Sequence, residues 1–147
     1  LALAAAEEGA TVHRGGTYVV MEGPAFSTRA ESFLYRSWGA SVIGMTALPE
    51  AKLAREAEMC YATLACATDY DCWHETEESV TVEMVVANLQ RNIATSKNTL
   101  QRVIPRLSAV RTCACGAALE SAILTAKEAI TQEDRRRLAP LAGKYLE

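Results

Sequence analysis

The sequence has 147 residues, of which half are hydrophobic and 22% are charged, and this is the size and composition of one ordinary globular domain. The net charge of −3 supplies no basic surface for nucleic acid or anionic membranes. No apolar run reaches the roughly 18 residues of a membrane span, and the first ten residues lack the basic start of a signal peptide. We therefore expect a soluble, cytoplasmic chain without nucleic-acid or membrane partners.

Helix-like and strand-like runs alternate along most of the chain. In order they are helix 1–9, strand 15–23, helix 28–39, strand 41–45, helix 49–58, strand 60–68 and helix 81–107. Thr28 and Glu31 have the spacing of a capping box, and Gly39 is a typical helix stop. Residues 116–130 and 132–147 predict two further helical pieces, the second interrupted by Pro140.

This order of elements predicts an α/β protein with a mixed central sheet. The strand at 60–68 is apolar on both faces, which is typical of a sheet covered by helices on both sides. The long helix from residue 81 carries an apolar stripe that we expect to pack over the sheet. The chain is then a single domain, or part of one, with a core over 1–108 and a helical C-terminal segment over 109–147.

Three loops, 22–28, 44–49 and 68–73, each follow a predicted strand directly. Such loops meet at the carboxyl edge of an α/β sheet, where ligands bind. Phe26 offers an aromatic plane, Met45 a polarizable contact, Thr46 a hydroxyl beside helix N-terminal amides, and Asp69 a carboxylate. Each loop could also be a simple turn or cap, but together these groups suit a nucleoside and an anion.

Three sequence elements resemble a known family: GPAFSTRAE, GMTALPE and TDYDCW, in this order and at these intervals. From about residue 17 to residue 107 the chain is similar to the 5'-methylthioadenosine phosphorylases of the trimeric purine nucleoside phosphorylase superfamily. The resemblance implies that the chain is the C-terminal half of a nucleoside phosphorylase-like fold. Beyond residue 111 the resemblance fades.

The resemblance implies a pentosyltransferase of purine and methionine salvage. In its reaction, inorganic phosphate attacks the sugar of 5'-methylthioadenosine or adenosine and releases adenine, with no cofactor. Thr46 would then bind phosphate, Met45 would lie against the ribose, and Phe26 would stack on the base or sugar. Asp69, half buried and protonated, would reach N7 and the amino edge of the purine, and Asp71 would assist.

Two further positions bear on which purine and which sugar would fit. Relatives specific for 6-oxopurines carry Glu where this chain has Ser27 and Asn where it has Asp69, so both residues favour a 6-aminopurine. Val82 and Val85 match an apolar pocket for the 5' end of the sugar. The same two valines would equally suit the core side of an amphipathic helix.

The family's N-terminal half supplies a glycine-rich phosphate loop and an Arg–His pair that do not precede Leu1 here. The resemblance also implies a homotrimer in which a neighbour closes the nucleoside pocket. Two alternatives stay open: a 6-oxopurine phosphorylase, and a non-catalytic module that binds nucleosides or serves assembly. A serine hydrolase is excluded because the chain has no G-x-S-x-G element.

The five cysteines are an odd number and favour reduced thiols. Cys60 and Cys66 would lie about 20 Å apart on one strand, too far to share a metal. Cys113 and Cys115 form a C-x-C pair that could be a disulfide or part of a metal site. Because no second pair of ligands lies close in sequence, we expect inert thiols and no metal.

Overall fold

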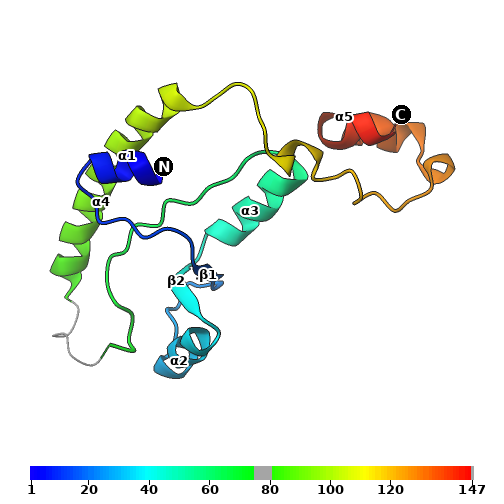
Figure 1. The fold of residues 1–147 in the computed structure, drawn as a ribbon. Helices are drawn as coiled ribbons and strands as arrows, with labels where there is room; N and C mark the ends of the chain where they lie inside the picture. The colour runs from blue at the N-terminus through cyan, green and yellow to red at the C-terminus, as the bar shows by residue number, and fades with distance from the viewer. Residues whose placement is uncertain (75–80, 147) are drawn as a thin grey trace. The chain divides into compact units, whose positions relative to one another are not determined.

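The computed structural model describes residues 1–74 and 81–146 (Figure 1). The chain forms two compact units, Leu1–Ala47 with Ala62–Leu107, and Leu48–Tyr61 with Ser108–Glu147. The second unit therefore includes residues 48–61 as well as the C-terminal segment. Within the described ranges, no helix is both long and apolar enough to cross a membrane.

A parallel pair of strands forms the sheet of the first unit. Strand β1 (Thr17–Val20) pairs with β2 (Ala40–Gly44), and α2 (Arg29–Ser37) is the crossover between them. The predicted capping box is confirmed: the Thr28 hydroxyl accepts from the Glu31 amide at 3.3 Å, and the Glu31 carboxylate accepts from the Thr28 amide at 2.7 Å. The α/β class is thus confirmed, with one parallel pair as the sheet.

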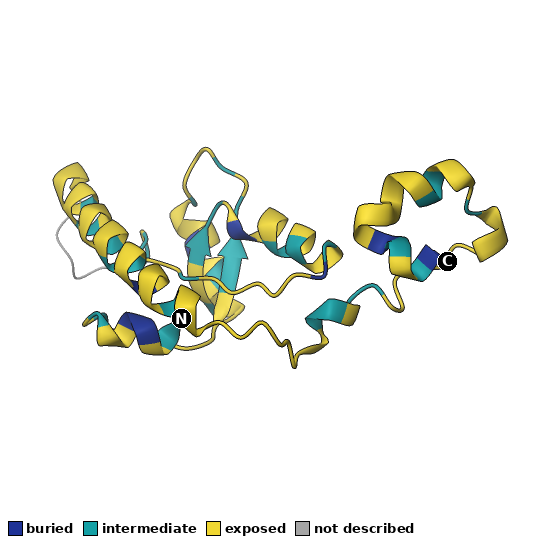
Figure 2. Ribbon diagram, turned by 90° about the horizontal axis from the view of Figure 1, so that it is seen from above, coloured by how far each residue is buried: buried dark blue, intermediate teal, exposed yellow. Residues whose placement is uncertain are grey.

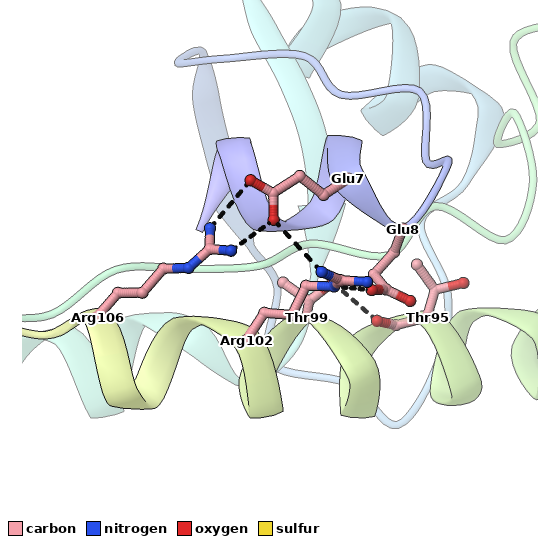
Figure 3. A network of polar contacts seen from close by, with 6 residues as sticks. All are labelled: Glu7, Glu8, Thr95, Thr99, Arg102 and Arg106. Carbon is pink, nitrogen blue, oxygen red and sulfur yellow. Dashed lines mark hydrogen bonds and ion pairs between the residues drawn. The ribbon is translucent and has the colours of Figure 1, made fainter.

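Helices α1 (Ala2–Glu7) and α4 (Val82–Val103) pack against each other in the first unit, and a single 3-10 turn, η1 (Ile104–Arg106), follows α4. Figure 3 shows the polar contacts that join them. Arg106 donates to both carboxylate oxygens of Glu7 at 3.0 and 2.8 Å, and Arg102 pairs with Glu7 and Glu8. The hydrogen bond from Arg106 lowers the pKa of Glu7.

The apolar stripe of α4 does not pack over the sheet as predicted. Its members remain largely exposed, as Figure 2 shows for most of the helix. Val82 is 75% exposed, whereas the polar Thr99 is fully buried. Thr99 can be buried because its hydroxyl donates to the Thr95 carbonyl at 2.8 Å, and Ala4 and Ala5 of α1 are small enough for close approach.

The prediction of a strand at 60–68 is wrong, because these residues form no strand. A strand requires a hydrogen-bonded neighbour, and no other strand of the described residues pairs with this segment. Side chains of α4 hold its end instead. The Asn88 amide donates to the Thr68 carbonyl at 2.8 Å, and the Asn92 amide donates to the Ala67 carbonyl at 2.9 Å.

The second unit contains α3 (Ala47–Glu56, which begins at the end of the first unit), α5 (Gln132–Leu146) and single 3-10 turns η2 (Ala114–Ala117) and η3 (Lys127–Ala129). The predicted helix over 116–130 is therefore wrong. One physical reason is that the Leu119 amide donates to the Glu58 carboxylate at 3.1 Å instead of to a helical carbonyl.

The predicted interruption of the last helix is also wrong, because α5 continues through Pro140. Contacts after the proline hold its final turn: Leu146 is buried, Tyr145 donates to the Glu58 carboxylate at 2.5 Å, and Lys144 pairs with the other carboxylate oxygen at 2.5 Å. These contacts offset the hydrogen bond that a proline removes.

Candidate functional site

Both strands of the sheet end at the same edge because they are parallel. The Met21 amide, just after β1, donates to the Gly44 carbonyl, the last of β2, at 2.9 Å. The loop that follows β1 and the Met45–Thr46 pair that follows β2 therefore begin side by side. This is the arrangement that the sequence predicted for its first two loops.

Met45 lies against the turn that opens the first loop. A Cβ placed on Gly23 would sit 2.8 Å from the Met45 sulfur, and Gly23 has φ +74. The close approach and the left-handed backbone both require glycine at this position. The half-buried Met45 side chain thus lies beside Gly23.

Phe26 and Thr46 are both exposed. The Phe26 side chain is 85% exposed, so its ring is free to contact a ligand or another chain. Thr46 immediately precedes α3 in the chain, and the N-terminus of a helix favours an anion.

The third loop contains the two aspartates. Asp69 is exposed, not half buried as predicted; its carboxylate accepts from the Thr68 hydroxyl at 2.7 Å and the Asp71 amide at 3.1 Å. Asp71 is half-buried and has φ +37, an uncommon conformation for a residue other than glycine. Its carboxylate accepts from the Ser32 hydroxyl at 2.7 Å and the Cys72 amide at 2.9 Å.

Contacts with α2 and with the first loop fix the position of the third loop. Ser32, which is 2% exposed, comes from α2, and the Cys72 thiol points to the Ser27 carbonyl at 3.8 Å. The Arg36 guanidinium lies over the Trp73 ring, 3.5 Å from its centroid. The loop that carries the aspartates therefore lies beside the loop that carries Phe26 and Ser27.

Val82 and Val85 belong to the first turn of α4. Val85, Asn88 and Asn92 are spaced three and four residues apart and so share one helix face. Because both asparagines bond to the segment 67–68, this face looks toward the chain that leads into Asp69. Val85 is half-buried there, whereas Val82 is exposed.

Some positioning residues were not anticipated from the sequence: Ser32, Arg36, Asn88 and Asn92. Ser32 acts on a residue 39 positions away, and no local pattern encodes such a pair. For Asn88 and Asn92 a signal exists, since two amides four residues apart on a helix that faces an extended segment can satisfy its carbonyls.

One group of side chains among the described residues has the spacing of metal ligands: Cys60, Cys113 and Cys115, all in the second unit. Hydrogen bonds from the Cys115 amide and then from the Cys60 thiol lower the pKa of Cys113 to about 7. In turn, Cys113 raises the pKa of Cys115. None of the residues predicted to bind the nucleoside belongs to this group.

Comparisons with known proteins agree on one family. Residues 1–105 match the model of the Phosphorylase superfamily. The chain is 57% identical over 143 residues to the S-methyl-5'-thioadenosine phosphorylase of Geobacter sulfurreducens, covering 97% of this chain and 50% of that protein. It is 54% identical over 135 residues to the enzyme of the same name from Gloeobacter violaceus, covering 91% and 45%.

Solved structures give the same result for the fold. A methylthioadenosine phosphorylase from an Antarctic soil metagenomic library superposes with a TM-score of 0.84 at 41% identity, covering 95% of this chain and 50% of that chain. A variant of the Schistosoma mansoni adenosine/methylthioadenosine phosphorylase in complex with methylthioadenosine gives 0.59 at 34% identity, covering 72% and 36%.

The chain spans about half the length of the curated relatives that it matches. The family match extends from α1 through the end of α4, so it includes every residue predicted for the nucleoside site. Sequence motifs, the parallel strand pair with its adjoining loops, and the superposition on solved structures therefore point the same way. This chain belongs to the Phosphorylase superfamily.

Proposed function

We propose that the protein carries out the phosphorolysis of 5'-methylthioadenosine and that this chain supplies the purine and sugar side of the site. The observation that carries the proposal is the meeting of the three loops. Met45 lies against Gly23, Cys72 contacts Ser27, and the third loop is tied to α2. The names of the most similar curated relatives support the same substrate.

The proposed reaction forms one bond and breaks one. A phosphate oxygen attacks C1' of the ribose, the C1'–N9 bond breaks, and its electron pair goes to the purine. The proton that phosphate loses on forming the ester balances the proton that adenine gains. Because the sugar becomes positively charged along this path, catalysis requires hydrogen bonding to the leaving purine and placement of the anion near the sugar.

Residues of the three loops divide these tasks. Thr46, beside the first turn of α3, binds phosphate, and the Met45 side chain covers the ribose. Phe26 stacks on the base or sugar through its exposed ring. The Asp69 carboxyl hydrogen-bonds the N7 and 6-amino edge of the purine.

Asp71 has a different part in the proposal. Its carboxylate is occupied by the Ser32 hydroxyl and the Cys72 amide, so it holds the loop that positions Asp69. This makes Asp71 a positioning residue and not a second group on the purine. Val82 and Val85 supply the apolar contact for the methylthio group at the 5' end of the sugar.

The remaining features of the proposal follow from family resemblance. The substrate pair is a nucleoside and inorganic phosphate, without a cofactor or a metal at the nucleoside site. The assembly is a homotrimer in the cytoplasm, and the exposure of Phe26 and Val82 leaves room for a neighbouring chain to close the nucleoside site.

The proposal is tested with the full-length natural protein by measuring adenine release from methylthioadenosine with and without phosphate. We expect adenine release from methylthioadenosine to depend on phosphate. Release of hypoxanthine from inosine should be much slower. Binding of methylthioadenosine without turnover would instead indicate a non-catalytic module, and a preference for inosine would indicate a 6-oxopurine enzyme. Either result would refute the proposal.

Asp69→Asn tests the role of the carboxylate, because asparagine has nearly the same shape but cannot transfer a proton. We expect kcat/KM for methylthioadenosine to fall by a factor on the order of 10². Relative activity on inosine should rise, and Ser27→Glu should extend that shift by accepting the N1 proton of a 6-oxopurine. Unchanged turnover of methylthioadenosine in a folded Asp69→Asn variant would show that Asp69 does not act on the purine.

A further inference from the structure

The three thiols of Cys60, Cys113 and Cys115 form a group that lies outside the nucleoside site; we call it the cysteine cluster. The Cys60 and Cys113 sulfurs are 3.3 Å apart, and all three sulfurs lie within 4.8 Å of one another. The sequence predicted inert thiols because no second pair of ligands lies close to the C-x-C pair, and Cys60 is 53 positions from Cys113. The folded chain brings the C-x-C pair to a third thiol.

The spacing of the cysteine cluster is close to what a thiolate-bound zinc ion requires. Zinc–sulfur bonds of about 2.3 Å in tetrahedral geometry place the sulfurs about 3.8 Å apart. The Cys60–Cys113 separation of 3.3 Å is below this value and no separation in the cluster exceeds 4.8 Å, so side-chain movements of about 1 Å suffice. Three ligands from two chain segments would leave a fourth position for water.

The backbone around the cysteine cluster is held in place by Glu58, which is 8% exposed and lies two residues before Cys60. Its carboxylate accepts from the Leu119 amide at 3.1 Å and from the Tyr145 hydroxyl at 2.5 Å, and its carbonyl accepts from Arg111 at 2.7 Å. The segment that carries Cys60 is thereby joined to the segment that carries the C-x-C pair before any ion binds. Preorganisation of this kind lowers the cost of assembling a metal site.

Two cationic side chains flank the C-x-C segment. The Arg111 guanidinium lies against Gly116, where an added Cβ would meet it at 3.4 Å. Lys144 donates to the Gly116 carbonyl at 2.6 Å. Three thiolates with one divalent cation carry a net charge of −1, which the Arg111 guanidinium offsets, whereas the charge of Lys144 is already balanced by Glu58.

We propose that the cysteine cluster is a binding site for a thiophilic divalent cation, represented by Zn²⁺, in which Cys60, Cys113 and Cys115 are the protein ligands. Binding displaces the thiol protons to solvent and involves no oxidation or reduction. The ion would fasten the end of α3 to the turn η2 within the second unit. Because its ligands are separate from the nucleoside residues, the site does not depend on the proposed reaction.

The proposal is tested on the full-length protein, purified without metal under a phosphine reductant. Zn²⁺ is titrated against a chromophoric chelator, and Co²⁺ is added separately. We expect one Zn²⁺ per chain, and with Co²⁺ a sulfur-to-metal charge-transfer band together with the visible bands of a four-coordinate site. Absence of stoichiometric Zn²⁺ binding by the reduced protein would overturn the proposal.

Single variants separate the cysteine cluster from the other thiols. Zn²⁺ affinity should fall by at least about 100-fold in each of the variants Cys60→Ser, Cys113→Ser and Cys115→Ser. Loss of a residue that only supports a metal ligand lowers affinity by about 100-fold at most, so a larger loss identifies a direct ligand. Cys66→Ser is the matched control, because Cys66 is exposed and its thiol contacts Ser96 instead; its affinity should be unchanged. An equal loss in all four variants would overturn the proposal.

A stability measurement completes the test. Zn²⁺ should raise the melting temperature of the wild type and of Cys66→Ser, and should leave that of Cys113→Ser unchanged. Mass spectrometry of protein isolated without air should show three free thiols in the cysteine cluster. A Cys60–Cys113 or Cys113–Cys115 disulfide as the native state would instead make the cluster a redox pair and refute the metal site.

Discussion

The hydrogen bond between Ser32 and Asp71 provides a direct test of how the third loop is held. Ser32→Ala removes only the hydroxyl, so the volume within α2 hardly changes while the Asp71 carboxylate loses its donor at 2.7 Å. A hydrogen bond to a charged group contributes about 1.5–3 kcal/mol. The lower end applies here because Asp71 is half-buried and keeps the Cys72 amide at 2.9 Å.

A loss of about 1.5 kcal/mol corresponds to about a tenfold change in an equilibrium constant. If the proposed reaction holds and this hydrogen bond keeps the loop in the conformation that binds the purine, kcat/KM for methylthioadenosine should fall about tenfold in the full-length protein. Urea unfolding should show a loss of stability of about 1–1.5 kcal/mol at most, because part of the loop can move without global unfolding.

Ser37→Ala is the matched control for this experiment. Ser37 lies on the same helix, and its hydroxyl donates to the Leu34 carbonyl at 2.7 Å, a contact local to α2 and exposed to solvent. Its removal should change stability by no more than about 0.5 kcal/mol and leave kcat/KM unaltered. If Ser32→Ala and Ser37→Ala behave alike, the tether from α2 to Asp71 has no part in positioning the loop.

Two further predictions concern other parts of the chain. Val82→Asp should reduce turnover of methylthioadenosine more than that of adenosine, since a carboxylate beside a thioether costs more than one beside a hydroxyl, and equal losses in steady-state assays would point to a folding effect. Hydrogen bonds from Lys144 and then Tyr145 lower the pKa of Glu58 from 4.5 to about 2. The stability that Glu58 contributes is therefore fully present above about pH 4.5 and is lost as the pH falls toward 2; urea midpoints at pH 5 and pH 3 should differ less in Glu58→Gln than in wild type.

Local signals in the sequence were reliable where one segment contains both partners. The capping box of Thr28 and Glu31 and the stop at Gly39, with φ +78, are encoded within twelve consecutive positions. The predictions failed where a distant partner decides the outcome. Residues 60–68 have the composition of a strand, but the carbonyls of Ala67 and Thr68 are bonded by side chains of α4. The helix that continues through Pro140 is held by Glu58.

In the candidate site, too, local features could be predicted from the sequence and features that depend on distant segments could not. The adjacency of the loops after β1 and β2 could be predicted because parallel strands end at one edge. The exposure of Asp69 could not, since burial depends on what other segments cover. Likewise, the C-x-C pair was visible in the sequence, but its third thiol comes from Cys60, which only the fold places beside it.

The sheet contains a close approach that bears on the motif Gly44-Met45-Thr46. A side chain at position 44 would overlap the Tyr18 hydroxyl, because the tyrosine ring leans across the neighbouring strand over this residue. The glycine is therefore demanded by the interior of the strand pair, whatever ligand the protein binds. Proteins that share only this packing of a tyrosine ring over the neighbouring strand would also carry the glycine, so the glycine by itself does not indicate the ligand.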